Sequence, residues 1–307
     1  MGLFSAARTA IPPPTPRNLW LLLAGLVAWQ NLGLVFATQD SPKHLLFVTL
    51  LWWGALTCME DRLESLRPRP SRISLALGSL LLFWSFWRSA QVITSDSVIF
   101  LLTPLQGLAL AMLCTPIRRL GQFRQQLLIF ALLPIYPLIY LSGPLAIWLE
   151  SWLSPLTATL SAGFLSSLGI EAISQGRLVQ TLSGGVSVQG PCSGLDQMCQ
   201  MLAIAVIFFL AFPLRRARHR ILLLAAAVLT AVAANTLRIA LLALIVSLEG
   251  PTANGGGWWF DFFHEDLGSL IFSGLGVYVF GALYLKVLDR ELGPSPVAHL
   301  PGDGTHE

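Results

Sequence analysis

Three polar residues in the second half of an apolar chain have the side-chain types that acyl transfer requires. Cys192 lies in the polar segment 190–196, Arg238 lies in a long run of Ala, Leu and Val, and His264 follows a cluster of aromatic residues. A thiolate can attack a carbonyl carbon while an imidazole moves the proton. A guanidinium can bind the oxyanion that forms. The three residue types therefore predict attack by a cysteine on a peptide carbonyl.

Cys192 lies where a polar segment leads into the next apolar run. Ser193 and Asp196 have the S-x-x-D spacing of a capping box, so we expect Ser193 to cap a helix. Cys192 would then lie beside the positive end of that helix, an environment that favours the reactive thiolate. The alternative is that Cys192 is a buried packing residue, as free cysteines commonly are.

The other cysteines are expected to take no part in this chemistry. Cys199 lies two helical turns beyond Cys192, about 10 Å away by helical rise, and a disulfide would need Cα atoms within about 7 Å. Cys58 and Cys114 are both expected at the cytoplasmic ends of their spans, away from Cys192. No CxxC pair is present, which argues against a redox or zinc motif.

Arg238 is expected to be functional because a charge inside a bilayer is costly. By helical rise it would lie about 14 Å below the outer end of its span. Asn235 precedes it by three residues and projects from the same helix face. Two alternatives stay open: Arg238 could join helices by pairing with Asp196 or Glu265, or it could bind an anionic substrate of a transporter.

His264 is the candidate general acid and base. His44 and His264 are the histidines expected on the outer side, and His is the side chain most easily poised for proton transfer near neutral pH. Asp261, Glu265 and Asp266 surround His264 and could orient its ring. The alternative is an interfacial histidine within an aromatic belt.

The composition excludes a water-soluble protein. Of 307 residues, 54% are hydrophobic and 11% are charged, whereas an ordinary soluble domain has about 25% charged residues. The fold class expected is an all-α polytopic membrane protein. HExxH metal sites, serine-hydrolase elbows and phosphate-binding glycine loops do not occur in the sequence, so metalloprotease, serine-hydrolase and nucleotide-dependent chemistry find no support.

Runs of about 20 apolar residues predict eight transmembrane helices. Basic residues gather on one side if the N-terminus is cytoplasmic, so both termini are expected inside. Residues 1–290 are expected to form a single integral-membrane domain, and residues 291–307 a disordered cytoplasmic tail. The predicted spans lie near residues 19–37, 44–59, 73–87, 98–114, 127–149, 195–212, 221–247 and 267–285.

The segment between the fifth and sixth spans is expected on the outer side. Residues 151–173 are apolar, but a crossing there would move the basic cluster 215–220 outside, so we expect a surface helix with Pro155 near its start. Residues 177–189 alternate in polarity and contain Gly184-Gly185 between two apolar runs. This pattern indicates a small β-hairpin, and a plain loop is the alternative.

The late part of the chain resembles the exosortase/archaeosortase family of multi-pass membrane cysteine transpeptidases, and it looks most like the cyanobacterial branch. The resemblance is carried by Pro191-Cys192-Ser193-Gly194, by Asn235-x-x-Arg238, and by His264 with Gly268 four residues later. The first four spans match in number and hydrophobicity alone. Glu265 is a departure, because many members have Gly directly after the histidine.

The resemblance implies roles and partners. Cys192 would be the nucleophile, Arg238 would stabilise the oxyanion or the substrate, and His264 would be the acid and base. Substrates would be exported proteins that end in a PEP-type motif, one transmembrane helix and a basic tail, transferred from a Cys192 thioester to an acceptor.

The same resemblance implies a place and a setting for this chemistry. The enzyme would lie in the bacterial inner membrane, with its active site on the extracytoplasmic side. Membrane lipids and an accessory membrane protein are expected partners, and no cofactor, metal or nucleic acid is expected. A transporter or an envelope-assembly scaffold with a structural Arg238 is the alternative function.

Overall fold

The computed structural model describes residues 15–38, 42–92, 98–141, 143–249, 257–264 and 267–292. Its first part consists of α1 (Pro16–Thr38), α2 (Pro42–Thr57), α3 (Glu60–Leu63), α4 (Arg72–Ser89), α5 (Ile99–Cys114), the 3-10 helix η1 (Ile117–Phe123) and α6 (Arg124–Leu141). Its second part consists of α7 (Pro144–Ser167), β1 (Ala172–Gln175), β2 (Leu178–Thr181), β3 (Gly184–Ser187), η2 (Gly190–Cys192), α8 (Leu195–Ala211), α9 (Ala217–Glu249), α10 (Trp258–His264) and α11 (Leu267–Leu292).

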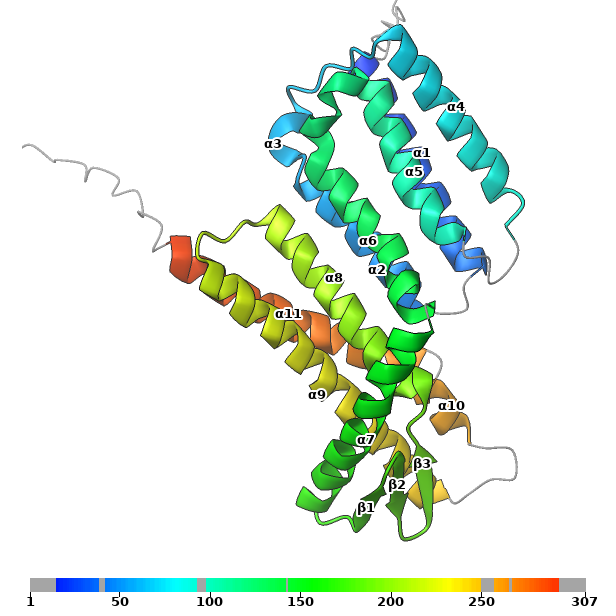
Figure 1. Ribbon diagram of the computed structural model, residues 1–307, viewed down its shortest axis with the longest axis vertical. Coiled ribbons are helices and arrows are strands. Elements are labelled where there is room, and N and C mark those ends of the chain that lie inside the picture. Colours follow the sequence, from blue (N-terminus) through cyan, green and yellow to red (C-terminus); the bar gives the residue numbers. More distant parts are fainter. Residues whose placement is uncertain are drawn as a thin grey trace, which may run out of the picture.

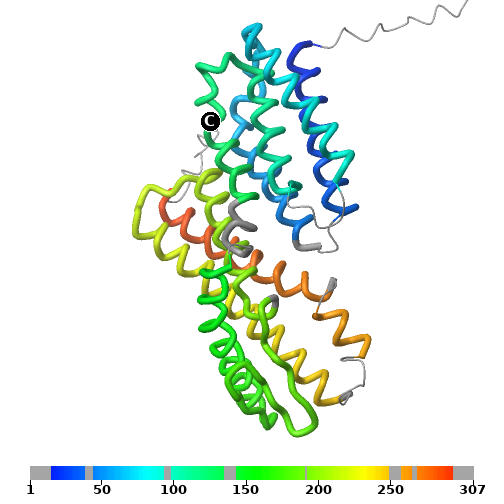
Figure 2. Tube along the Cα trace, turned by 45° about the vertical axis from the view of Figure 1, so that its right-hand side comes forward, coloured from blue at the N-terminus to red at the C-terminus, as the bar shows by residue number. Residues whose placement is uncertain are grey.

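The two parts form adjoining helical bundles (Figure 1). One bundle contains α1, α2, α4, α5 and α6, and the other contains α8, α9 and α11 with α7, α10 and the sheet at one end. Figure 2 shows the same division from a second direction. Helices α2 and α6 both pack against α8 and join the bundles, so the late helices rest on a scaffold built by the early ones.

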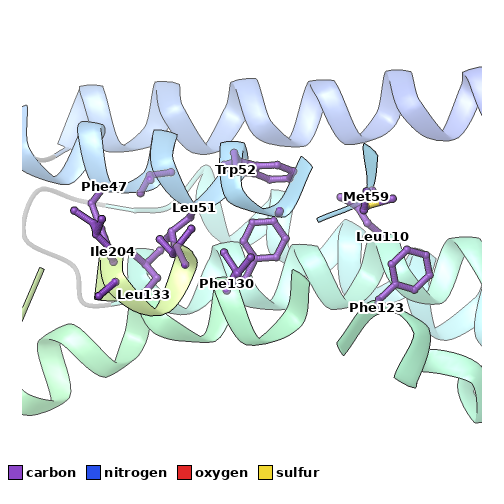
Figure 3. Close-up of a cluster of buried hydrophobic side chains, with 14 of the residues drawn as sticks. Phe47, Leu51, Trp52, Met59, Leu110, Phe123, Phe130, Leu133 and Ile204 are labelled. Atoms are coloured by element: carbon purple, nitrogen blue, oxygen red, sulfur yellow. The ribbon is translucent and has the colours of Figure 1, made fainter. Parts of the chain in front are cut away.

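Close packing of apolar and small residues holds this junction together. Figure 3 shows Phe47, Leu51, Phe130 and Ile204 in the buried cluster that α2, α6 and α8 share. Gly107 lets α5 approach α6, since a Cβ there would lie 2.5 Å from the Phe130 ring. Helices in lipid associate through this kind of packing, because the hydrophobic effect gives no net drive between them.

A buried polar cluster joins α1 to α5. Asn31 donates through Nδ2 to Gln106 Oε1 at 2.6 Å and accepts from Thr103 Oγ1. Gln106 Nε2 donates to Gln30 Oε1 at 2.9 Å. Because an unsatisfied amide in an apolar setting is costly, these bonds fix the relative register of the two helices.

The helices confirm the all-α fold class and most of the predicted apolar runs. Among the described residues, three helices are long and apolar enough to cross a membrane, or four if the bent pair of residues 99–114 and 117–134 is one span. Helices 44–57 and 195–211 are apolar but shorter. The count of eight spans and their orientation therefore stay predictions.

The predicted fifth span is wrong at its end. Helix α6 ends at Leu141, and Gly143 adopts a positive φ of 62° that begins a separate helix with Pro144 in its first turn. Residues 144–149 thus belong to α7, and the helix predicted over 151–173 starts earlier and ends at Ser167. A left-handed glycine followed by proline ends one helix and starts another, and a uniformly apolar sequence conceals this break.

Two arginines of the first bundle make hydrogen bonds to main-chain groups of nearby loops. Arg62 Nη1 donates to the Gln122 carbonyl at 3.1 Å, and the Arg69 amide donates to the Cys114 carbonyl at 3.0 Å. Both bonds join the loops at one end of the first bundle, where Figure 1 shows α3 and η1 on the side away from the sheet. The predicted tail begins inside α11, and residues 293–307 lie outside the described part of the chain.

The external segment forms a three-stranded antiparallel sheet of order β1-β2-β3. The predicted hairpin is confirmed as β2 and β3, with Val179 opposite Val186, and β1 is an additional strand. Val179, Val186 and Val188 are buried in a cluster with residues of α7 and α9. The sheet is therefore packed on one face against the two helices that flank the late polar residues.

We predict that Asn31→Ala lowers the free energy of unfolding by about 1–3 kcal/mol, because Gln106 and Thr103 would lose a buried partner. Thermal unfolding in detergent would measure the change. Asn18→Ala on the same helix is the control, because Asn18 is exposed. Equal melting temperatures for the two variants would contradict a stabilising role for the cluster.

Candidate active site

Cys192 lies in η2, the short turn between β3 and α8. Its amide donates to the Gln189 carbonyl at 2.7 Å, and the Ser193 amide donates to the Gly190 carbonyl at 3.0 Å. The Cys192 side chain is 5% exposed and belongs to the apolar cluster that contains Val188 and Ile239. The sheet, α8 and α9 therefore all contribute to its position.

The predicted capping box is wrong. The residue that caps α8 is Gly194, with φ of 92° and no side-chain cap bond. Ser193 Oγ instead donates to the Gly190 carbonyl at 2.7 Å and accepts from the Leu195 amide at 3.3 Å. The Ser193 hydroxyl thus stabilises the turn that holds Cys192, and the helix begins beyond it.

His264 lies within hydrogen-bonding distance of Cys192. The distance from Cys192 Sγ to His264 Nε2 is 3.2 Å, close enough for direct proton transfer between the thiol and the imidazole. Phe260 stacks on the imidazole at 5.2 Å between ring centroids and 17° between ring planes. Of the carboxylates predicted to orient the ring, Asp261 is exposed, and Glu265 and Asp266 lie outside the described residues.

Arg238 binds the end of the helix that carries His264. Its Nε donates to the Phe263 carbonyl at 3.3 Å, and its Nη2 donates to the His264 carbonyl. These carbonyls end α10 and have no partner within that helix. Arg238 is 4% exposed and interacts electrostatically with Cys192 and Asp196. One buried cation thus fixes the backbone of the histidine.

Asn235 holds the backbone on the other side of the pair. Its Nδ2 donates to the Cys192 carbonyl at 3.0 Å. A Cβ at Gly194 would lie 2.8 Å from the same nitrogen, so the glycine leaves the space that Asn235 occupies. As the helical spacing predicts, Asn235 and Arg238 act from one face of α9, Asn235 on Cys192 and Arg238 on His264.

Two hydroxyl residues of α7 complete the support and were not found from the sequence. Thr157 Oγ1 donates to the Ser193 carbonyl at 3.0 Å, and Ser161 Oγ donates to the Thr236 carbonyl at 3.1 Å. They lie four residues apart and so share one helix face. That spacing of small polar residues in an apolar helix is the signal that could have identified them.

All four cysteines are free thiols. The prediction that Cys192 and Cys199 form no disulfide is therefore confirmed. In the described part of the chain, His, Cys, Asp and Glu side chains form no group of three that could hold a metal ion.

Long apolar helices, and a half-buried histidine in contact with a buried cysteine and a buried arginine, define a class of membrane protein equipped for thiol chemistry. The family model described as Transmembrane exosortase (Exosortase_EpsH) matches residues 29–281, and the chain belongs to this family. The family is in general one of membrane-embedded cysteine transpeptidases that sort exported proteins. Searches of curated proteins and of solved structures found no match.

The family match confirms the resemblance and extends it to the early helices. The residues that first suggested it lie in the late helices, whereas the match begins within α1 at residue 29. The scaffold bundle and the helices around Cys192 thus belong to one family architecture.

We predict that Gly194→Ala destabilises the protein by about 1–3 kcal/mol, because its backbone is left-handed and a Cβ would displace Asn235. Thermal unfolding in detergent would measure this. Gly163→Ala is the control: Gly163 lies inside α7 with open space around it, and alanine there is expected to be neutral or stabilising by about 0.5–1 kcal/mol. A stable Gly194→Ala variant would contradict the close approach of α8 and α9.

Proposed function

We propose that the protein is a membrane-embedded cysteine transpeptidase that cleaves exported proteins at a C-terminal PEP-type sorting signal and transfers them to an acceptor. The observation that carries the proposal is the 3.2 Å distance from Cys192 Sγ to His264 Nε2. Membership of the exosortase family supports the same chemistry.

The first half of the reaction forms a thioester. His264 Nε2 takes the proton from Cys192 Sγ, and the thiolate attacks the carbonyl carbon of the scissile peptide bond. A carbon–sulfur bond forms, and the carbonyl oxygen becomes an oxyanion. When this intermediate collapses, the carbon–nitrogen bond breaks, and His264 returns the proton to the departing amine. The exported part of the substrate is then bound to Cys192.

The second half releases the product. An acceptor amine or water attacks the thioester carbonyl and gives a proton to His264. The carbon–sulfur bond breaks, and the proton passes from His264 to Cys192, which restores the thiol. Whether the result is transfer or hydrolysis depends on which nucleophile reaches the thioester first.

Arg238 serves this reaction in two ways. Its bonds to the Phe263 and His264 carbonyls hold the end of α10 against the cysteine. Its positive charge favours the thiolate and stabilises the oxyanion, an effect that is large where water is excluded. The proposal therefore assigns Cys192, Arg238 and His264 together to the catalytic site.

The proposed setting is the bacterial inner membrane, with Cys192 on the extracytoplasmic side. The basic loops around α3 lie at the end of the first bundle away from the sheet, and the basic loop between α8 and α9 lies at the end of the second bundle away from the sheet (Figure 1). Such loops stay in the cytoplasm. A substrate helix with a basic cytoplasmic tail would then bring its scissile bond to the outer side. Binding helix against helix is favoured by small residues such as Gly274, which has open space around it.

The alternative function is a transporter or an envelope-assembly scaffold. Both alternatives require Arg238, but neither gives the Cys192 thiol a chemical role. Direct contact between Cys192 and His264 favours the enzyme, because neither alternative needs a thiol paired with an imidazole.

We predict that Cys192→Ala abolishes cleavage of an exported reporter that ends in a PEP-type motif, a transmembrane helix and an arginine cluster. The thioester cannot form without the sulfur. Co-expression followed by immunoblotting for reporter size would measure this. Cys199→Ala is the control and should cleave as the wild type does. Equal shortening by wild type and Cys192→Ala would contradict the thiol mechanism.

We predict that Arg238→Lys lowers the rate of reporter cleavage by about 10²-fold or more, because a lysine keeps the charge but cannot bridge two carbonyls in a fixed geometry. The initial rate of reporter shortening would be measured at matched enzyme levels. Reactivity of Cys192 toward a small maleimide, with Cys192→Ala as the blank, would report the state of the thiol separately. Wild-type cleavage by Arg238→Lys would show that charge alone is sufficient.

A further inference from the structure

Strand β3 is an edge strand, and the main-chain groups on its outer side make no hydrogen bond to another residue of the described part of the chain. The Val188 amide donates to the Arg177 carbonyl at 2.8 Å, and the register places Ser187 opposite Leu178 and Gly185 opposite Gln180. Because alternate residues of an antiparallel strand bond to the partner strand, Gly185 and Ser187 direct their N–H and C=O groups away from β2. These groups form the edge of the sheet on the β3 side.

This edge is accessible and leads directly to the nucleophile. Exposed and buried residues alternate along this strand. Gly185 and Ser187 are exposed, whereas Val186 and Val188 are buried. Two residues after Val188 the chain enters η2, the turn that contains Cys192. In Figure 1, β3 is the strand of the sheet on the side of α10, the helix that carries His264. A peptide on this edge would therefore extend toward the cysteine–histidine pair.

We propose that the outer edge of β3 binds the substrate segment that precedes the scissile bond, as a fourth strand. Strand addition supplies affinity through main-chain hydrogen bonds and holds a peptide extended. An extended peptide exposes its carbonyls, which attack by Cys192 requires. The inference rests on the proposed function for the identity of the peptide.

The order of parts in the substrate fixes the direction of the added strand. The exported domain precedes the sorting motif, and the transmembrane helix follows it. Strand β3 runs from the tip of the sheet toward Cys192 and the helical bundle (Figure 1). A substrate whose helix enters the membrane beyond Cys192 must therefore run parallel to β3, with the residues before the scissile bond along Gly185 and Ser187.

Disulfide trapping tests this arrangement without requiring catalysis. The enzyme would carry Cys192→Ala, which holds the substrate uncut, and Ser187→Cys. Single cysteines would be placed at successive reporter positions on both sides of the scissile bond, and oxidative cross-links would be scored on a nonreducing gel. Because side chains of a strand alternate between faces, cross-links should recur at every second position before the bond.

The opposite edge of the sheet, which packs against α7, supplies a control in which the edge is covered. Ser174 on β1 lies opposite Val179, and Val179 directs its main-chain groups to β3, so Ser174 directs its own away from β2. Ser174→Cys is expected to give no periodic cross-links. Three results would overturn the proposal. They are no cross-link with either Ser187→Cys or Ser174→Cys, the same cross-link pattern with both variants, and cross-links only at reporter positions after the scissile bond. An enzyme-to-enzyme link through Ser187→Cys alone would assign the edge to a second copy of the chain.

A proline comparison in the active enzyme tests the hydrogen bonds themselves. Ser187→Pro removes the edge N–H at a place where a strand tolerates proline, and Ser174→Pro does the same on the other edge. We expect Ser187→Pro to lower the rate of reporter cleavage about tenfold, the effect of losing one hydrogen bond, while Ser174→Pro cleaves like wild type. Equal rates for the two proline variants would overturn the proposal, whereas a wild type that cuts no reporter would contradict the proposed function instead.

Discussion

The site depends on one buried cation. Arg238 is almost fully enclosed, and its guanidinium donates to the last two carbonyls of α10. A buried charge is tolerated only where hydrogen bonds and opposite partial charge surround it. The carbonyl end of a short helix supplies both, so the cost of burying the arginine is offset by the same contacts that position His264. Without that cation, α10 would lose the hydrogen bonds from α9 to its last two carbonyls.

The nucleophile is held through its backbone, by hydrogen bonds from neighbouring side chains. Asn235 binds the Cys192 carbonyl, Thr157 binds the next carbonyl along, and Gly194 supplies the left-handed residue that turns the chain into α8. Three helices and the sheet thus meet at one short turn. This arrangement fixes the sulfur 3.2 Å from the imidazole and leaves the Cys192 side chain for chemistry. The early bundle contributes by supporting α8 from the opposite side.

The polar residues of the site could be predicted because lipid makes them conspicuous. Arg238 stands out in an apolar helix, and its separation of three residues from Asn235 predicts one shared face. The break at Gly143 could not be predicted, because it falls inside a continuous apolar run. The capping box failed because Ser193 and Gly194 both offer capping chemistry, and packing against Asn235 decides between them. Strand β1 could not be predicted, because its pairing with β2 depends on main-chain hydrogen bonds and its four residues have no distinctive pattern.

In the proposed reaction, Cys192 carries the substrate as a thioester during turnover. Mass spectrometry of the purified enzyme after brief exposure to the reporter tests it most directly, since the adduct would be mapped to a peptide and challenged with neutral hydroxylamine. We expect an adduct on the peptide that contains Cys192, with the mass of the reporter segment before the scissile bond, and its loss on hydroxylamine treatment. Reporter cleavage with an unmodified Cys192, or an adduct on another residue, would contradict it.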